Sequence, residues 1–112
     1  MYNIGDFCIA KIRMSYDNHL YRDGSFKYRP ILIIDRVGKF YKCLSLTSLL
    51  HDYGMDRIDV FTNYNMIKHS QIICKDAILV NESSISKCIA KCEPNDFAYI
   101  LNRYKENKER RK

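Results

Sequence analysis

The chain has 112 residues and a formal net charge of +6, which fits one domain at roughly 100–200 residues per domain. Hydrophobic residues make up 46% and charged residues 29% of the sequence, a composition that excludes a disordered, collagen-like or low-complexity chain. No apolar run approaches the roughly 20 residues of a membrane-spanning helix, and the N-terminus lacks the order of a signal peptide, so we expect a cytoplasmic protein without a membrane segment.

The N-terminal quarter of the chain predicts one strand and a long loop. Gly5-Asp6 has the composition of a turn, and residues 7–13 are rich in residues that favour strands. Residues 14–27 contain Asp17-Asn18 and Asp23-Gly24, two pairs that are typical of turns. This segment is too long for a tight hairpin, so we expect a loop, of a length that is often functional.

An apolar strand, a tight turn and an alternating strand follow. In Tyr28–Asp35 four aliphatic residues run without interruption, which predicts a strand buried on both faces. Pro30 cannot donate a hydrogen bond to a neighbouring strand, so it should lie among the first residues of this one. Val37-Gly38-Lys39 predicts the turn, and residues 40–47 alternate between two faces. One face has Phe40, Leu44 and Leu46, and the other has Tyr41, Cys43, Ser45 and Thr47.

The second half of the chain predicts shorter strands and a terminal helix. Strand-like segments occur at 58–61, 70–74 and 77–80, with a loop at 48–56 and a turn or short helical turn at 81–84. Pro94 suits the first position of a helix. After it, one face of an amphipathic helix is formed by Phe97, Ile100, Leu101 and Tyr104. We therefore predict a single domain over residues 1–112, mainly antiparallel β, with five to seven strands in a small barrel or half-barrel and one C-terminal helix.

Motifs for metal or cofactor chemistry are absent from the sequence. The cysteines are Cys8, Cys43, Cys74, Cys88 and Cys92. They include no Cys-x-x-Cys pair, and we interpret them as reduced, mostly buried thiols. There is no glycine-rich phosphate loop, His-Glu-x-x-His or Gly-x-Ser-x-Gly, so we expect no metal and no cofactor.

The basic excess and the histidines leave more than one interpretation open. Residues 105–112 contribute five basic and two acidic residues, so this tail and the rest of the chain each carry +3. Such a balance favours an anionic partner, either nucleic acid or an acidic protein, or it only keeps the chain soluble. The histidines, His19, His51 and His69, fall in predicted loops, where they are either solvated or a pair that cleaves RNA by acid–base catalysis.

One pair of residues predicts a site for phosphodiester chemistry. Arg29 and Thr47 lie nine residues before and nine residues after Gly38, so a hairpin centred on Gly38 makes them near neighbours across two strands. A guanidinium binds phosphate oxygens as a two-pronged donor, and a hydroxyl adds another hydrogen bond. The alternative is an ordinary surface arginine beside a threonine at the end of a strand.

Several short motifs, taken in order, resemble the MazF/PemK-like toxins of bacterial toxin–antitoxin systems. They are Gly5-Asp6, Tyr28–Ile34 with its Arg-Pro, Leu44–Ser48, Ser70–Val80, and Ser86–Lys91 with the final helix. The resemblance covers nearly the whole chain. It departs in the longer loop before Arg29, which has no Gly-Gly, and at Ile73 and Lys75, where some relatives place an arginine and an aspartate.

The resemblance implies an SH3-like barrel, a homodimer and a metal-independent endoribonuclease that cuts single-stranded RNA. By resemblance, Arg29 and Thr47 match the catalytic arginine and threonine, which would make the ribose 2′-hydroxyl attack the adjacent phosphorus and leave 2′,3′-cyclic phosphate and 5′-hydroxyl ends. RNA would also be contacted by His19, Tyr21, Arg22, Lys27, Tyr28 and Ser48. The expected partners are single-stranded RNA and an antitoxin, protein or RNA.

A second hypothesis uses the same fold without catalysis. Related barrels inhibit DNA gyrase, and a plain nucleic-acid-binding module is also compatible with the charge, because a fold does not determine a function. The Arg29–Thr47 pair favours the endoribonuclease, since a gyrase inhibitor does not require it.

Overall fold

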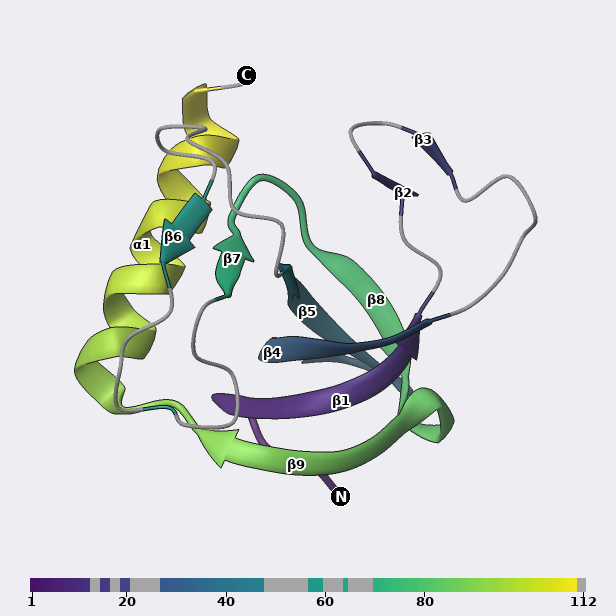
Figure 1. Ribbon diagram of the computed structural model, residues 1–112. Helices are drawn as coiled ribbons and strands as arrows, with labels where there is room; N and C mark the ends of the chain where they lie inside the picture. Colours follow the sequence, from purple (N-terminus) through teal and green to yellow (C-terminus); the bar gives the residue numbers. More distant parts are fainter. Residues whose placement is uncertain are drawn as a thin grey trace.

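The computed structural model describes residues 1–12, 15–16, 19–20, 27–47, 57–59, 64 and 70–110. In this part of the chain the strands are β1 (Asp6–Ile12), β2 (Ser15–Tyr16), β3 (His19–Leu20), β4 (Lys27–Val37), β5 (Phe40–Thr47), β6 (Arg57–Asp59), β7 (Gln71–Ile73), β8 (Ile78–Asn81) and β9 (Ile85–Lys91), and the helices are a 3-10 turn (Glu82–Ser84) and α1 (Pro94–Arg110). The main sheet has the order β6-β7-β5-β4-β1-β9, with β8 also paired to β5. It is strongly curved, and α1 covers one side (Figure 1). The predicted fold class, mainly antiparallel β with a C-terminal helix, is confirmed.

The sheet buries side chains on both of its faces, in two clusters. The face toward α1 contributes Phe7, Leu32, Ile34, Leu44 and Leu46, which pack with Ile100 and Tyr104 of the helix. The opposite face contributes Cys8, Ala10, Ile12, Ile31, Ile33, Tyr41 and Cys43. Because successive residues of a strand point to opposite faces, the uninterrupted aliphatic run in β4 supplies both clusters, as predicted.

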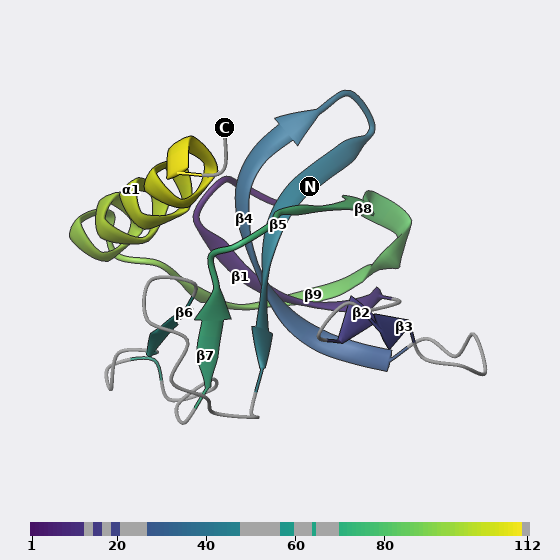
Figure 2. The same ribbon diagram turned by 90° about the horizontal axis from the view of Figure 1, so that it is seen from above.

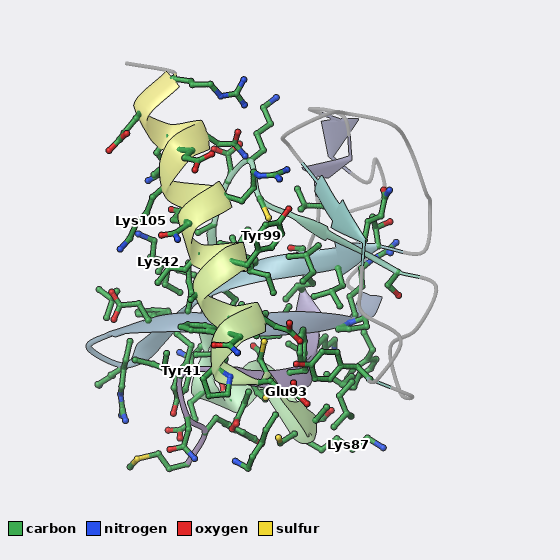
Figure 3. All side chains as sticks on the ribbon, turned by 90° about the vertical axis from the view of Figure 1, so that its left-hand side faces the viewer. Tyr41, Lys42, Lys87, Glu93, Tyr99 and Lys105 are labelled. Carbon is green, nitrogen blue, oxygen red and sulfur yellow. The ribbon has the colours of Figure 1, made fainter. Side chains whose placement is uncertain are left out.

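The helix presents the predicted apolar stripe to the sheet. Ile100 and Tyr104 are buried, and Phe97 and Leu101 pack against the same cluster. The stripe continues to Asn107, a buried residue whose amide nitrogen donates to the Cys74 carbonyl at 3.1 Å. The residues predicted as a basic tail therefore form the last turns of α1 up to Arg110, and Lys42 and Lys105 lie beside this end of the helix (Figure 3).

The β4–β5 hairpin has a two-residue turn followed by a β-bulge. Gly38 has φ +62°, a conformation that glycine adopts without strain, and Val37 pairs with Phe40 across the turn. Further along, the register shifts between Ile33 and Asp35, so β4 contains one more residue than β5 over the same length. The tip of this hairpin projects from the rest of the sheet (Figure 2).

The predicted loop at 14–27 is wrong in part. Within it β2 and β3 form a small antiparallel ladder, with Ser15 opposite Leu20 and Tyr16 opposite His19, and Lys27 already belongs to β4. The Asp17-Asn18 pair, identified in the sequence as typical of a turn, suits the connection of such a ladder. No helix among the described residues is long and apolar enough to cross a membrane.

Candidate functional site

Arg29 and Thr47 lie at the same end of the sheet and on the same face. The last paired residues of β4 and β5 at this end are Ile31 and Ser45. Arg29 and Thr47 are each two residues beyond them, so both side chains point to the face of Ile31 and Ser45. From there the strands separate, because β4 continues along β1 and β5 continues along β7 (Figure 2).

The alignment of Arg29 with Thr47 results from the bulge and not from the turn. Next to the turn, each residue of β4 and its partner in β5 have numbers that add up to 77, as Val37 and Phe40 do. If this register continued to the end of the strands, Pro30 would be level with Thr47. Past the bulge the paired numbers add up to 76, as in Ile31 and Ser45. The extra residue in β4 thus brings the guanidinium, instead of the proline ring, to the face of the hydroxyl.

Buried polar side chains gather around this end of β5. Ser45, Thr47 and Gln71 are all buried, and Thr47 is only 2% exposed. Gln71 on β7 is directly opposite Thr47, so it shares the same face. Buried polar groups are costly unless they form hydrogen bonds, and a group of three at the end of a strand otherwise lined by apolar residues is typical of a functional site.

Arg29 is the more accessible member of the pair. Its side chain is partly exposed although its Nε atom is buried, and Arg29 pairs with Ala10 of β1. An arginine in this position can present the terminal nitrogens of its guanidinium to an anion, while the sheet holds the part of the side chain nearer the backbone. An arginine on the same face as buried hydroxyl and amide groups can therefore bind a phosphate.

Tyr28 belongs to the other face of the sheet. It is 65% exposed and lies opposite the exposed Lys11 of β1. Because Tyr28 and Arg29 are successive residues of one strand, the structure does not bring Tyr28 onto the face that holds Thr47. The exposed Tyr28 ring therefore lies beside Lys11, at the same end of β4 as Arg29 but on the opposite face.

The other predicted RNA contacts fall mostly outside the described residues. Tyr21, Arg22 and Ser48 lie wholly outside them. His19 is in β3 and Lys27 begins β4, but their side chains are also outside the described part of the chain. Gln71 is the site residue that the sequence analysis missed, because its only signal is a polar residue beginning an otherwise apolar short strand.

Comparison with known proteins identifies solved structures that share this fold. No protein-family model and no curated protein matches the sequence. Among solved structures, an endoribonuclease in complex with its cognate antitoxin from Mycobacterial species matches with a TM-score of 0.74 at 7% identity, over 97% of this chain and 96% of that one. Mycobacterium tuberculosis toxin MazF-mt6 matches with a TM-score of 0.68 at 13% identity, over 93% and 96%. The chain therefore has a MazF-like fold over nearly its whole length.

Proposed function

We propose that this protein is the toxin of a toxin–antitoxin pair and cleaves single-stranded RNA at the Arg29–Thr47 end of the sheet. The observation that carries the proposal is the placement of a partly exposed arginine and a buried threonine on one face, at one end of a MazF-like fold. The solved chains with this fold are named as an endoribonuclease and as a MazF toxin.

The chemistry uses a nucleophile from the substrate itself. The 2′-hydroxyl gives up its proton to solvent as its oxygen forms a bond to the adjacent phosphorus. The 5′ oxygen of the next nucleotide takes up a proton as its bond to phosphorus breaks, which leaves a 2′,3′-cyclic phosphate and a 5′-hydroxyl end. Arg29 binds the non-bridging oxygens and stabilises their growing negative charge. The Thr47 hydroxyl donates a hydrogen bond to a non-bridging oxygen. Because the 2′-hydroxyl is the nucleophile, DNA is not cut, and no metal ion is required for the attack.

The partners follow from charge and exposed surface. RNA is the substrate, and the exposed Tyr28 ring beside Lys11, on the face of β4 opposite Thr47, suits a stacked base outside the cleavage site. An antitoxin would bind and neutralise the toxin; one of the matching structures is an endoribonuclease in complex with its cognate antitoxin. Val37, Phe40 and Leu79 are exposed apolar side chains at the tip of the hairpin and on β8, a surface that suits a second copy of the chain.

The deciding experiment incubates the purified protein with a long single-stranded RNA in EDTA and maps the new ends. We expect discrete cuts with 5′-hydroxyl ends, and a loss of at least about 100-fold in cleavage rate in Arg29→Gln, because a donor to the transition-state charge is removed. Arg29→Lys keeps the charge but not the two-pronged geometry, so it should recover only part of the rate.

Thr47 offers a matched pair of variants. Thr47→Ser keeps the hydroxyl and Thr47→Val keeps the shape, so only the second should slow cleavage, by roughly tenfold to 100-fold for a lost hydrogen bond to a charged group. Equal RNA cleavage rates for wild type and Arg29→Gln would overturn the assignment of this site. Intact RNA under all conditions would overturn the endoribonuclease and direct attention to gyrase supercoiling assays.

A further inference from the structure

Two cysteines and an aspartate converge where β1 meets β9. Cys8 and Cys88 are directly opposite each other across these strands, which run side by side along the lower edge of the sheet in Figure 1. The two Sγ atoms and a carboxylate oxygen of Asp6 all lie within 4.8 Å of one another. Among the side chains that the structure describes, no other three histidine, cysteine or acidic groups lie this close.

A bulge in β9 produces this convergence. Phe7 pairs with Ala90, but the next residue, Cys8, pairs with Cys88 and not with Ile89. The extra residue in β9 therefore turns Cys88 onto the face of Cys8. Asp6 is two residues before Cys8 and shares that face. Bulges commonly re-aim a side chain toward a functional position.

The carboxylate is held in place and already faces a cation. The Asn3 backbone N–H donates to Asp6 Oδ2 at 3.0 Å, which fixes the orientation of the carboxylate. The other oxygen, Oδ1, accepts from Lys91 Nζ at 3.2 Å. The Asp6 side chain is 6% exposed and that of Lys91 is 72% exposed, so the ammonium can leave for water while the carboxylate stays. An exposed lysine is therefore a replaceable occupant of a fixed anionic position.

We propose that Asp6, Cys8 and Cys88 bind one thiophilic divalent cation of the zinc class. Two thiolates and one carboxylate are a ligand set that suits zinc, and softer ions such as cadmium follow the same preference for sulfur. Each thiol loses its proton to solvent as its metal–sulfur bond forms. Cys88 is exposed, so water can complete the coordination on its side. The Asn3 N–H, which donates to Asp6 Oδ2, keeps the carboxylate oriented for the cation.

The site is separate from the endoribonuclease proposal and does not depend on it. It joins β1 to β9, the strand that leads into α1, and cleavage as described above uses none of its residues. A bound cation would cross-link the first strand of the chain to the last and so raise the melting temperature.

The test titrates the reduced, desalted full-length protein with Cd²⁺ alone and follows the ultraviolet sulfur-to-cadmium charge-transfer band. We expect saturation at one equivalent, displacement by Zn²⁺, and a rise in melting temperature. Cys88→Ser replaces an exposed residue on an edge strand, and it should halve the band and weaken binding more than about tenfold. Asp6→Asn should keep the band and weaken binding.

Two further variants make the test specific. Cys92→Ser removes a half-buried thiol outside the group and should leave band and affinity unchanged. Lys91→Met removes the competing ammonium and should tighten binding by up to about fivefold, the range of a surface ion pair. The proposal is overturned by a reduced wild type without the band, by a full band in Cys88→Ser, or by equal losses in Cys88→Ser and Cys92→Ser.

Discussion

Tyr64 connects the beginning of α1 to the core through a single hydroxyl group. Its ring is buried against Phe7, with ring centres 5.1 Å apart. The hydroxyl donates to Asp96 Oδ2 at 2.8 Å and accepts from the Glu93 N–H at 2.7 Å, and Figure 3 shows Glu93 at the lower end of the helix. Burial raises the pKa of Tyr64, so the hydroxyl keeps the proton that it donates.

Tyr64→Phe should lower the free energy of unfolding by about 1–3 kcal/mol, because it leaves a half-buried carboxylate and a backbone N–H without the Tyr64 hydroxyl. Urea denaturation measures the change. The control is Tyr99→Phe, which removes an exposed hydroxyl that accepts from Arg103 on the helix surface and should change stability by less than about 0.5 kcal/mol. Equal effects would show that the Tyr64 hydroxyl does not anchor the helix.

The thiols differ in burial and should therefore differ in reactivity. Burial raises the pKa of Cys43 to about 12, whereas Cys88 is exposed. With iodoacetamide at pH 8, Cys88 should be alkylated first, because the thiolate is the nucleophile. Alkylation of Cys43 in the folded protein should still increase with pH above pH 9, where a thiol of ordinary pKa levels off. Peptide mass spectrometry measures both rates, and early labelling of Cys43 would contradict the expectation.

At the scale of elements, the β4–β5 hairpin holds both halves of the candidate site, and its turn depends on one glycine. Gly38 has a positive φ, and no atom lies within 4 Å of the position that a Cβ would take. A side chain there would therefore be disfavoured by the backbone conformation alone and not by a clash.

Gly38→Ala should destabilise the fold by about 1–2 kcal/mol, the cost of a left-handed conformation for a residue with a side chain. Thermal or urea unfolding measures it. Lys39→Ala, at the neighbouring exposed turn position, should be nearly neutral. A neutral Gly38→Ala would mean that the turn relaxes to another type.

Local patterns predicted the elements, and long-range pairing supplied what they could not. The alternation in residues 40–47 and the stripe from Phe97 to Tyr104 match the two clusters, because periodicity directly reports which face is buried. The bulges at Ile33–Asp35 and before Cys88 leave no periodic signal. The meeting of Cys8 with Cys88 depends on residues eighty positions apart in the chain. Asn107 extends an apolar stripe with a polar residue whose amide donates to the Cys74 carbonyl, a long-range partner that periodicity does not report.

At the scale of the whole molecule, three of the exposed apolar side chains in the described part of the chain, Val37, Phe40 and Leu79, lie at the tip of the hairpin and on the neighbouring β8. Val37 is opposite Phe40, and Leu79 is opposite Lys42, two residues further along β5. All three apolar residues therefore share one face, and they are exposed. A surface of this kind is costly in water unless another protein covers it.

Leu79→Glu should shift the protein from dimer to monomer in sedimentation velocity, because it places a charge within the proposed contact between copies. Tyr99→Glu is the control, since Tyr99 is an exposed aromatic residue on α1 and not on this face. A wild type that sediments as a monomer would contradict the proposed homodimer while leaving the Arg29–Thr47 site untouched.

The extra residue in β4 makes the hairpin sensitive to length rather than to composition. One residue more between Arg29 and the bulge would shift the end of the strand by one place, and an uncharged ring would take the place of the cation beside Thr47. Exchanges of one aliphatic residue for another between Arg29 and the turn would preserve the register. Descendants of this sequence should therefore tolerate exchanges among aliphatic residues here, while an insertion of one residue between Arg29 and the bulge should abolish cleavage.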